Sequence, residues 1–331
     1  MRIRIIKPGM LSTVQDMGRR GYISQAVPVS GAMDALSARM ANIALGNDGN
    51  AAVIEFTYAN AEFIAETGIL IAYAGDGAIL SLAIGDIPAD RPVFIPAGTT
   101  VKLNNDLSGS RTYLAVAGGW DVPEVLGSKS TYLTASIGGL QGRQLRAGDE
   151  LNSIDQFTTS TTKTILDNLQ SDSPNYTDWS LGRQLLLPAD RKTIRVMRGN
   201  EFDWFDSNSQ SDFFTTPYTL SLRSNRMGYQ LDGCGMKRIK WDELLSTAVT
   251  PGTIQVTGGG SPVLLMADCQ TTGGYPRIAQ VAAVDLSLCG QLKPGDTIYF
   301  KEISRHDAEM LYLEREKQLA KLANAVRNRY L

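Results

Sequence analysis

The sequence predicts a mainly β protein that is organised as two β-barrel domains. Most of the chain consists of short apolar or alternating runs separated by Gly- and Pro-containing turns, which is the pattern of barrels and sandwiches. Few segments have helical spacing, and a weak internal repeat links the two halves of the chain. The chain has 331 residues, which is more than a single hydrophobic core usually supports.

Short strands are expected throughout. The run 79–84, followed by Gly85 and Asp86, predicts a hairpin because its apolar stretch ends in a turn pair. The N-terminal nine residues have a short strand pattern. Further strands are expected at 93–95, 100–103, 112–116, 252–256 and 263–267.

Only two segments have the periodicity of a helix. The first covers residues 33–44, and either Asp34 or Ser30 could cap its start. The second covers residues 307–329 and follows a capping-box pattern that begins at Ser304.

The internal repeat consists of three pairs of segments in the same order. These pairs are 96–101 with 251–256, 113–117 with 264–268, and 144–149 with 291–296. The preserved order favours a duplicated domain. The alternative is that Pro-Gly and Gly-Asp turns simply recur in β proteins.

The expected domain boundaries follow from this repeat and from composition. A stretch rich in Ser, Thr, Asp and Asn separates the halves and predicts a linker. The expected parts are a first barrel at 1–155 (with residues 1–50 able to pack with the second), a linker at 156–190, a second barrel at 191–300 and a C-terminal helix at 301–331.

Composition excludes several classes of partner. A formal net charge of −2 provides no basic surplus for nucleic acid, and no apolar run reaches the length of a membrane span. The N-terminus lacks the apolar core of a signal peptide. Three cysteines without paired spacing favour free thiols in a reducing cytoplasm, so we expect a cytoplasmic protein without nucleic-acid or membrane partners.

The single histidine narrows the chemistry. His306 lies in a charged C-terminal stretch, outside every candidate site. This argues against a Ser-His-Asp or Cys-His site and against a histidine-based zinc site, so no metal is expected. Any catalysis must therefore use carboxylates, Lys, Arg, Tyr, hydroxyls and backbone N–H groups.

The strongest candidate for a ligand site follows the apolar run 263–267. There the chain changes from packing residues to polar side chains and two adjacent glycines, which allow another group to approach the backbone closely. The residues concerned are Asp268, Gln270, Thr271, Thr272, Gly273, Gly274 and Tyr275. A run of this kind is difficult to explain as core, so we favour a functional interpretation.

Other polar or glycine-rich segments have both functional and structural interpretations. Gln15, Asp16 and Arg19 could hold an anion or form a structural turn, and Ser30 to Asp34 could bind an anion or cap a helix. The remaining candidates are Gly118 and Gly119, the loop with Arg143, and the segment with Asn225 and Arg226.

As a set, these motifs resemble one family. The motifs are Thr13-Val14-Gln15-Asp16, Ser30-Gly31-Ala32-Met33-Asp34, Ala115-Val116-Ala117-Gly118-Gly119, Gly138-Gly139 with Gly142-Arg143, Ser224-Asn225-Arg226-Met227-Gly228 and Gln270-Thr271-Thr272-Gly273-Gly274-Tyr275-Pro276. The sequence resembles the family of the 5-oxoprolinase C subunit, also described as KipA or the allophanate hydrolase subunit 2 domain, among the biotin-dependent carboxyltransferases. The resemblance covers roughly residues 1–300. Lys129 stands where the family commonly has Arg, which puts a bidentate role there in doubt.

The resemblance implies a fold and a function. It implies two cyclophilin-like β-barrel domains and a subunit of an ATP-dependent amide (lactam) hydrolase that converts 5-oxo-L-proline to L-glutamate. It also implies two partners, a KipI-like B subunit together with a LamB/YcsF-like A subunit, with ATP used through the complex.

We assign two sets of residues to this expected site. The catalytic set is Arg226, Gln270, Asp268 and Arg19. The substrate-binding set is Gln15, Asp16, Ser30, Asp34, Gly118, Gly119, Arg143, Asn225, Thr271, Thr272, Gly273, Gly274 and Tyr275. Cations and N–H donors of this kind would stabilise negative charge on the oxygen of the substrate.

Two alternative functions stay open. One is the carboxyltransferase component of a biotin-dependent urea carboxylase/allophanate hydrolase system. That reaction needs a biotinylated lysine, and no segment here resembles Ala-Met-Lys-Met, so no biotin is expected on this chain. The other is a KipA-type regulatory antagonist of a kinase inhibitor.

Overall fold

The chain folds into two compact, mainly β units, as the sequence predicts. The computed structural model describes residues 1–106, 108–154, 159–240, 242 and 244–330. Unit 1 comprises Met1–Arg19, Asp34–Leu186 and Glu316–Leu331, and unit 2 comprises Arg20–Met33 and Leu187–Arg315.

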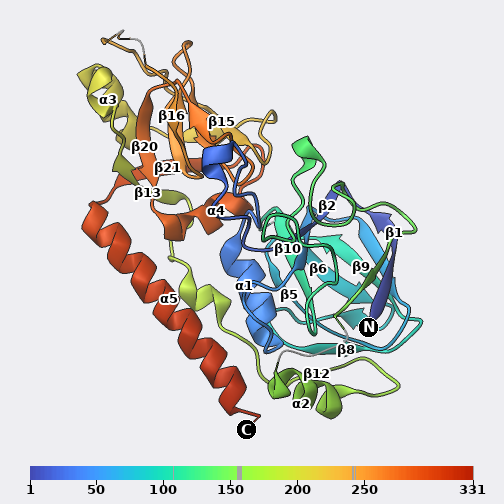
Figure 1. Ribbon diagram of the computed structural model, residues 1–331. Helices are drawn as coiled ribbons and strands as arrows, with labels where there is room; N and C mark the ends of the chain where they lie inside the picture. Colours follow the sequence, from blue (N-terminus) through green and yellow to red (C-terminus); the bar gives the residue numbers. More distant parts are fainter. Residues whose placement is uncertain (107, 155–158, 241, 243, 331) are drawn as a thin grey trace. The chain divides into compact units, whose positions relative to one another are not determined.

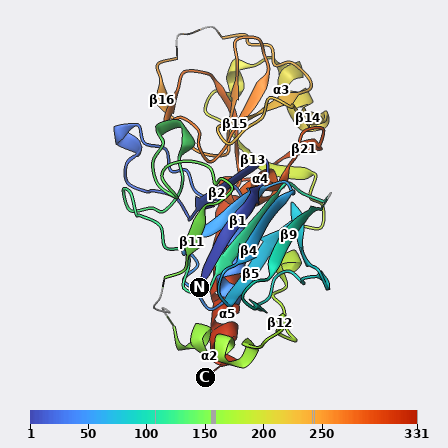
Figure 2. The same cartoon turned by 90° about the vertical axis from the view of Figure 1, so that its right-hand side faces the viewer.

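Unit 1 consists of two six-stranded sheets, in the orders β11-β1-β4-β9-β6-β7 and β12-β8-β5-β10-β3-β2. Figure 2 shows β1, β4 and β9 of the first sheet side by side. The strands are β1 Arg2–Pro8, β2 Leu11–Gln15, β3 Val53–Thr57, β4 Ala61–Ala65, β5 Ile69–Gly75, β6 Ala78–Leu82, β7 Gly85–Asp86, β8 Val93–Ile95, β9 Thr100–Asn105, β10 Arg111–Val116, β11 Glu150–Asn152 and β12 Asn175–Tyr176. The predicted hairpin is present as β6 and β7, paired through Ser81 and Asp86.

The core of unit 1 lies between these two sheets. Strands β1 and β9 alternate between buried and more exposed residues, because one face meets the core and the other meets solvent. Strands β5 and β10 are buried along nearly their whole length, because helix α1 (Ala35–Ala44) packs against them (Figure 1). This arrangement explains why residues 113–116 of β10 form a continuous apolar run rather than an alternating one.

Helix α1 begins where the sequence predicted. Asp34 is its N-cap, and the Asp34 side chain accepts a hydrogen bond from Ser37 N at 3.0 Å. Ser30, the alternative cap, takes no part in the cap of this helix. The helix is followed by Gly46, whose φ of +71° suits glycine.

The segment predicted as a linker contributes a helix that the sequence did not reveal. Residues 156–158 of the predicted linker lie outside the described residues, and helix α2 (Ser160–Leu169) follows them. Its buried face includes Thr161 and Thr162, so the apolar stripe that would mark a helix is weak. Thr162 Oγ1 donates to the carbonyl of Leu45 at 2.8 Å, which ties α2 to the end of α1.

Unit 2 contains a closed seven-stranded barrel, in the order β13-β20-β17-β18-β15-β14-β21. Its strands are β13 Thr193–Arg198, β14 Tyr218–Leu220, β15 Gly228–Asp232, β17 Thr253–Val256, β18 Pro262–Leu265, β20 Arg277–Val281 and β21 Thr297–Glu302, and the short ribbon is β16 Thr247–Ala248 with β19 Thr272–Gly273. Within the barrel, β13 and β21 pair in parallel and the other pairs are antiparallel. Inward side chains of these strands form the second core, and Phe213 from helix α3 (Ser207–Thr215) stacks on Phe300 with ring centroids 4.7 Å apart.

Helix α5 (Arg305–Asn328) is the predicted C-terminal helix. Ser304 and Asp307 form one half of the expected capping box: Asp307 N donates to Ser304 Oγ at 3.1 Å, and the Asp307 carboxylate accepts from the Ser304 hydroxyl at 2.7 Å. The other helical elements are helix α4 (Leu286–Gln291) and the short 3-10 turns Ile23–Gln25, Leu133–Ala135, Arg183–Leu186, Phe202–Trp204 and Ala283–Asp285. No helix in the described part of the chain combines the length and apolar character needed to cross a membrane.

Two turns of the predicted repeat have the same local geometry. Asp149 Oδ2 accepts from Arg146 N at 2.7 Å, and Asp296 Oδ2 accepts from Lys293 N at 2.9 Å. The glycine before each aspartate has a φ of +89°. That glycine donates to a strand carbonyl in its own unit, at 2.8 Å in unit 1 and 2.9 Å in unit 2. This equivalence supports a duplicated domain.

Candidate functional site

A buried ionic cluster in unit 2 joins three distant segments of the chain. Arg226 Nε donates to Asp268 Oδ2 at 2.8 Å, and Arg226 Nη2 donates to Asp268 Oδ1 at 3.1 Å. Ser30 Oγ donates to the same carboxylate at 2.5 Å. Arg226 Nη2 also donates to the carbonyl of Gly31 at 2.7 Å. The cluster therefore holds the end of β18, the loop before β15 and the segment Arg20–Met33 in one fixed arrangement.

The backbone around this cluster is also constrained. Ser30 has a φ of +57°, which is uncommon for a residue other than glycine, and Gly31 has a φ of +88°. Asp268 N donates to the carbonyl of Arg226 at 2.9 Å, so the ion pair is reinforced by a main-chain bond. Asn225, the neighbouring predicted residue, accepts from Met227 N at 2.8 Å and shapes the turn that presents Arg226.

The polar segment after β18 is anchored at both ends. Asp268 is held by Arg226 at its start. At its end, Arg277 makes a bidentate pair with Glu201, with bonds of 2.7 and 2.6 Å. Between these anchors, Thr272 and Gly273 pair with β16, and Gln270, Thr272 and Tyr275 are exposed. The segment is therefore a row of hydrogen-bonding groups held at both ends, in which the predicted residue Thr271 is buried.

Gln255 supports this row of groups. The sequence patterns did not identify it as a candidate residue. Its buried side chain lies on β17; its Nε2 donates to the carbonyl of Tyr275 at 3.2 Å, and its Oε1 accepts from Gln270 Nε2 at 3.4 Å. A Cβ at Gly273 would lie 2.5 Å from Gln255 Nε2, so a larger residue there would displace the Gln255 side chain from its present position. The available signal was a glutamine between Ile254 and Val256, two core residues of a fully buried strand.

Cys269 cannot act as a nucleophile in this segment. Burial, together with the neighbouring Asp268 carboxylate, raises the pKa of Cys269 to about 12. The thiol therefore stays protonated near neutral pH. Chemistry at this strand end must rely on hydrogen-bond donors and acceptors.

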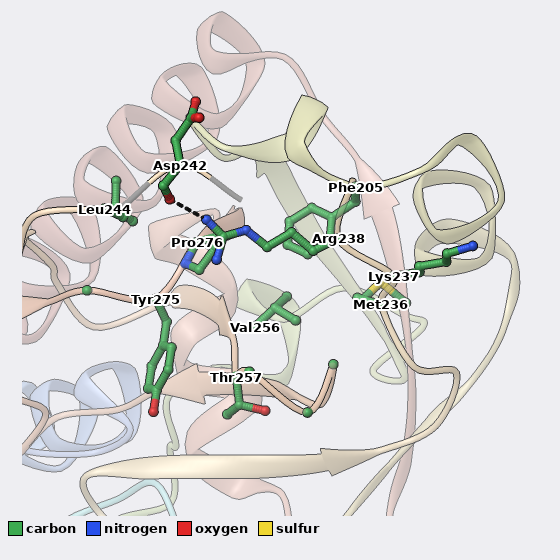
Figure 3. A pocket seen from close by; sticks show the side chains of 14 residues that line it. Phe205, Met236, Lys237, Arg238, Asp242, Leu244, Val256, Thr257, Tyr275 and Pro276 are labelled. Atoms are coloured by element: carbon green, nitrogen blue, oxygen red, sulfur yellow. Dashed lines mark hydrogen bonds between the residues drawn. The ribbon is translucent and has the colours of Figure 1, made fainter. Parts of the chain in front are cut away.

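A cavity of about 670 Å³ opens beside the polar segment (Figure 3). Figure 3 shows Tyr275 on one side of the view and Lys237 on the other, with Val256 and Phe205 between them. The cavity is lined by Phe205, Met236, Lys237, Arg238, Asp242, Leu244, Val256, Thr257, Gly258, Gly259, Gly260, Gly274, Tyr275 and Pro276. Its volume lies in the range used by small-molecule ligands. Of the predicted residues, Gly274 and Tyr275 contribute to it.

In unit 1, Asp16 organises a loop. Its carboxylate accepts from Ser128 Oγ at 2.7 Å, from Lys129 N at 2.6 Å and from Gly18 N at 2.8 Å. Arg19 is fully buried, and its Nη2 donates to the carbonyl of Ser130. These bonds hold the loop 128–130 in place. The Asp16 carboxylate is therefore occupied by hydrogen bonds within unit 1.

Gln15 is buried beside this loop. Its Nε2 donates to Thr13 Oγ1 at 2.9 Å and to the carbonyl of Thr131 at 3.2 Å. The structure therefore brings Gln15, Asp16 and Arg19 together around one loop of unit 1.

Two other predicted groups in unit 1 are committed to internal bonds. Gly118 N donates to Asn47 Oδ1 at 2.9 Å, and Gly119 N donates to the carbonyl of Val116 at 2.9 Å, so neither N–H is open to a ligand. Arg143 forms a bidentate pair with Asp149, at 2.7 and 2.8 Å, and this pairing lowers the pKa of Asp149. Arg143 thereby stabilises a turn of the repeat.

Asp34 belongs to a buried polar network in unit 1. Its side chain caps α1, and its backbone N donates to Tyr113 Oη at 2.7 Å. Nearby, Arg183 pairs with Asp76 and lies 3.4 Å from Asp90 Oδ1. Burial raises the pKa of Asp90 to about 6, although Arg183 acts in the opposite direction. No pattern in the sequence indicated this network.

The chain matches the family described as "Carboxyltransferase domain, subdomain A and B" over residues 25–302. It is 37% identical to the C subunit of 5-oxoprolinase from Escherichia coli (strain K12), and the match covers 98% of this chain and 99% of that protein. It is 31% identical to the urea amidolyase of Saccharomyces cerevisiae, over 93% of this chain but 17% of that protein.

A solved structure shares the fold. The crystal structure of Kluyveromyces lactis urea carboxylase matches 97% of this chain and 29% of its own chain, with a TM-score of 0.86 and 30% sequence identity. The chain thus corresponds to one part of the longer urea-processing proteins. On the strength of the family match and of these similarities, the chain belongs to the family of the carboxyltransferase domain, subdomains A and B.

Proposed function

We propose that this chain is the C subunit of an ATP-dependent 5-oxoprolinase, which converts 5-oxo-L-proline to L-glutamate. The observation that carries this proposal is the end-to-end match to a protein of that name, because 98% of this chain pairs with 99% of it. The urea amidolyase, by contrast, is far longer and is matched over 17% of its length. The match therefore extends over nearly the whole of both sequences, as expected for a separate subunit.

The reaction requires activation of an unreactive lactam. In the proposed route, the γ-phosphoryl group of ATP is transferred to the lactam carbonyl oxygen, and ADP leaves. Water then adds to the ring carbon, the C–N bond breaks with proton transfer to nitrogen, and a second water releases phosphate from the resulting acyl phosphate. Phosphoryl transfer and the final hydrolysis of the acyl phosphate place negative charge on oxygen, which hydrogen-bond donors can stabilise.

The polar segment of unit 2 has the features needed for that role. It presents the Gln270 amide and the Thr272 hydroxyl at the surface, and it is fixed by the Arg226–Asp268 and Arg277–Glu201 pairs. We assign substrate contact to Gln270 and to the neighbouring backbone donors. Arg226 and Asp268 are positioning residues in this proposal, because their hydrogen bonds join them to each other and to the backbone.

Two further proteins complete the proposed enzyme: a KipI-like B subunit together with a LamB/YcsF-like A subunit, with ATP used through the complex. The support for partners is that the E. coli relative is itself named as one subunit of 5-oxoprolinase. The proposal concerns the assembled enzyme rather than the isolated chain.

The test is co-expression of this chain with both partners, followed by measurement of ATP-dependent glutamate release. Gln270→Ala should lower turnover about a hundredfold, since a lost donor to developing charge costs about 3 kcal/mol. The side chain is exposed, so folding and assembly should be retained. Gln170→Ala, an exposed amide at the end of α2, is the matched control. Equal turnover for both variants would discard the assignment of Gln270.

The second candidate function is the carboxyltransferase step of a urea carboxylase. The observation that favours it is the TM-score of 0.86 to the Kluyveromyces lactis enzyme. If the three-subunit complex releases no glutamate but the chain transfers carbon dioxide from a carboxybiotin carrier to urea, this second function replaces the first.

A further inference from the structure

Three glycines that line the cavity of unit 2 have no local structural reason to be glycine. None of Gly258, Gly259 and Gly274 has a φ in the left-handed region. A Cβ at Gly258 would meet nothing within 4 Å, and one at Gly259 would lie 4.0 Å from its nearest neighbour. At Gly274 the nearest atom would be 3.4 Å away, which is ordinary contact.

The next glycine in the same turn provides the contrast. Gly260 has a φ of +82°, and a Cβ there would lie 2.9 Å from the carbonyl oxygen of Met236. Gly260 is therefore required by the fold, whereas side chains at Gly258 and Gly259 would occupy only the open space of the cavity. The absence of those side chains is explained if a ligand approaches the backbone at this point.

The turn also offers donors. Within the described part of the chain, the N–H groups of Gly258 and Gly259 make no hydrogen bond, while Gly260 N donates to the carbonyl of Thr257 at 2.9 Å. Free consecutive N–H groups in a glycine turn form a concave site for anions. A phosphate group, with several acceptor oxygens, suits such a turn.

The charges around the cavity favour an anion. Lys237 and Arg238 line it, and the carboxylate of Asp242, which also lines it, is 3.6 Å from Lys240 Nζ. Arg238 is held in place by the carbonyls of Lys240 and Asp242, the latter at 2.6 Å, and by the Trp204 ring 4.9 Å away. Among the described lining residues, positive charge therefore exceeds negative charge.

An aromatic side chain completes the lining. Tyr275 lines the cavity and is 51% exposed, so a planar group in the cavity could stack on its ring. The cavity, at about 670 Å³, is much larger than 5-oxoproline, a single five-membered ring with one carboxylate. The cavity therefore has room for a larger anion that carries a planar group.

We propose that this cavity binds a nucleoside triphosphate, with its phosphates at Gly258, Gly259 and Lys237 and its base against Tyr275. The identification of this ligand as the ATP of the lactam reaction rests on the proposed function. The binding of a nucleotide rests on the cavity alone. The polar segment ends in Gly274 and Tyr275, so the nucleotide site adjoins the proposed substrate contacts.

The experiment is calorimetric titration of the full chain, alone and in the assembled complex, with ATP, ADP and inorganic tripolyphosphate. Gly259→Val should weaken ATP binding at least tenfold while leaving thermal unfolding unchanged, because the added side chain meets open space. Gly235→Val is the matched control, since its Cβ also meets nothing within 4 Å and Gly235 does not line the cavity.

Two further variants separate the parts of the site. Lys237→Met should weaken both ATP and tripolyphosphate, whereas Lys301→Met, an exposed lysine on β21, should weaken neither. Tyr275→Ala should weaken ATP but not tripolyphosphate, because only the nucleotide has a base. The nucleotide assignment would be overturned if tripolyphosphate bound with the same affinity as ATP and if Tyr275→Ala changed neither affinity.

The proposed function and this inference can fail separately. Suppose that Gly259→Val releases glutamate at an unchanged rate, and that Gly259→Val and Gly235→Val bind ATP equally well both as the chain alone and in the assembled complex. This result would overturn the nucleotide site and leave the proposed function intact. If the complex binds a nucleotide in a way that depends on Gly259 and Lys237 but releases no glutamate, this result would support the nucleotide site and overturn the proposed function.

Discussion

Replacement of Arg226 by Met should destabilise unit 2 strongly, because it leaves the buried carboxylate of Asp268 without its cationic partner. Both side chains of the Arg226–Asp268 pair are 6% exposed. The substitution removes two bonds to Asp268 and the bond to Gly31, while Ser30 still donates to the carboxylate. Loss of one partner of a buried ion pair costs about 3–5 kcal/mol.

The matched comparison is Arg198→Met. Arg198 pairs with Glu302, but these side chains are 54% and 45% exposed, so the pair contributes about 1 kcal/mol or less. With a urea dependence of about 2 kcal/mol per molar, Arg226→Met should lower the midpoint of the unit 2 transition by about 2 M, and Arg198→Met by less than about 0.5 M.

The assay is urea unfolding followed by hydrogen exchange and mass spectrometry, which assigns each transition to peptides of unit 1 or unit 2. Adding Asp268→Leu to Arg226→Met should recover much of the loss, since no buried charge then lacks a partner. Equal midpoints for Arg226→Met and Arg198→Met, or no recovery in the double variant, would refute the reasoning.

Two further predictions concern unit 1. The pKa of Asp90 is raised from 3.8 to about 6 at a side chain 13% exposed, so its contribution to stability is complete below pH 3.8 and is lost as the pH rises through 6. This loss amounts to about 3 kcal/mol, and Asp90→Asn should reduce the pH dependence of the unit 1 urea midpoint between pH 4 and 6 by this contribution. Asp34→Ala should lower the free energy of unfolding by about 1–2 kcal/mol and speed amide exchange in α1, whereas Asp34→Asn should restore most of it.

Much of the fold could be predicted because its signals are local. The hairpin of β6 and β7, the caps of α1 and α5, and the Gly-Asp turns all depend on residues a few positions apart. Helices α2 and α3 were not predicted, because Thr or Ser residues interrupt the apolar stripe on their buried faces.

The candidate site was predicted in part. The sequence indicated Arg226, Asp268 and Ser30 as polar residues in separate motifs, and the structure joins them in one cluster. It also indicated Gly118 and Arg143, whose hydrogen-bonding groups are used within unit 1. Sequence patterns reveal which groups could bind a ligand but not which are already satisfied by the protein.

The sequence by itself determined the mainly β class, the helix caps and the position of a polar strand end, because periodicity and turn chemistry act over short distances. The tertiary structure alone decided that Ser30 donates to Asp268, which lies 238 residues away, and that Gln255 supports the segment before Tyr275. It also decided that two glycines of one turn face open space while the third is required for packing. These features depend on which strands become neighbours in the barrel, and no local pattern contains that information.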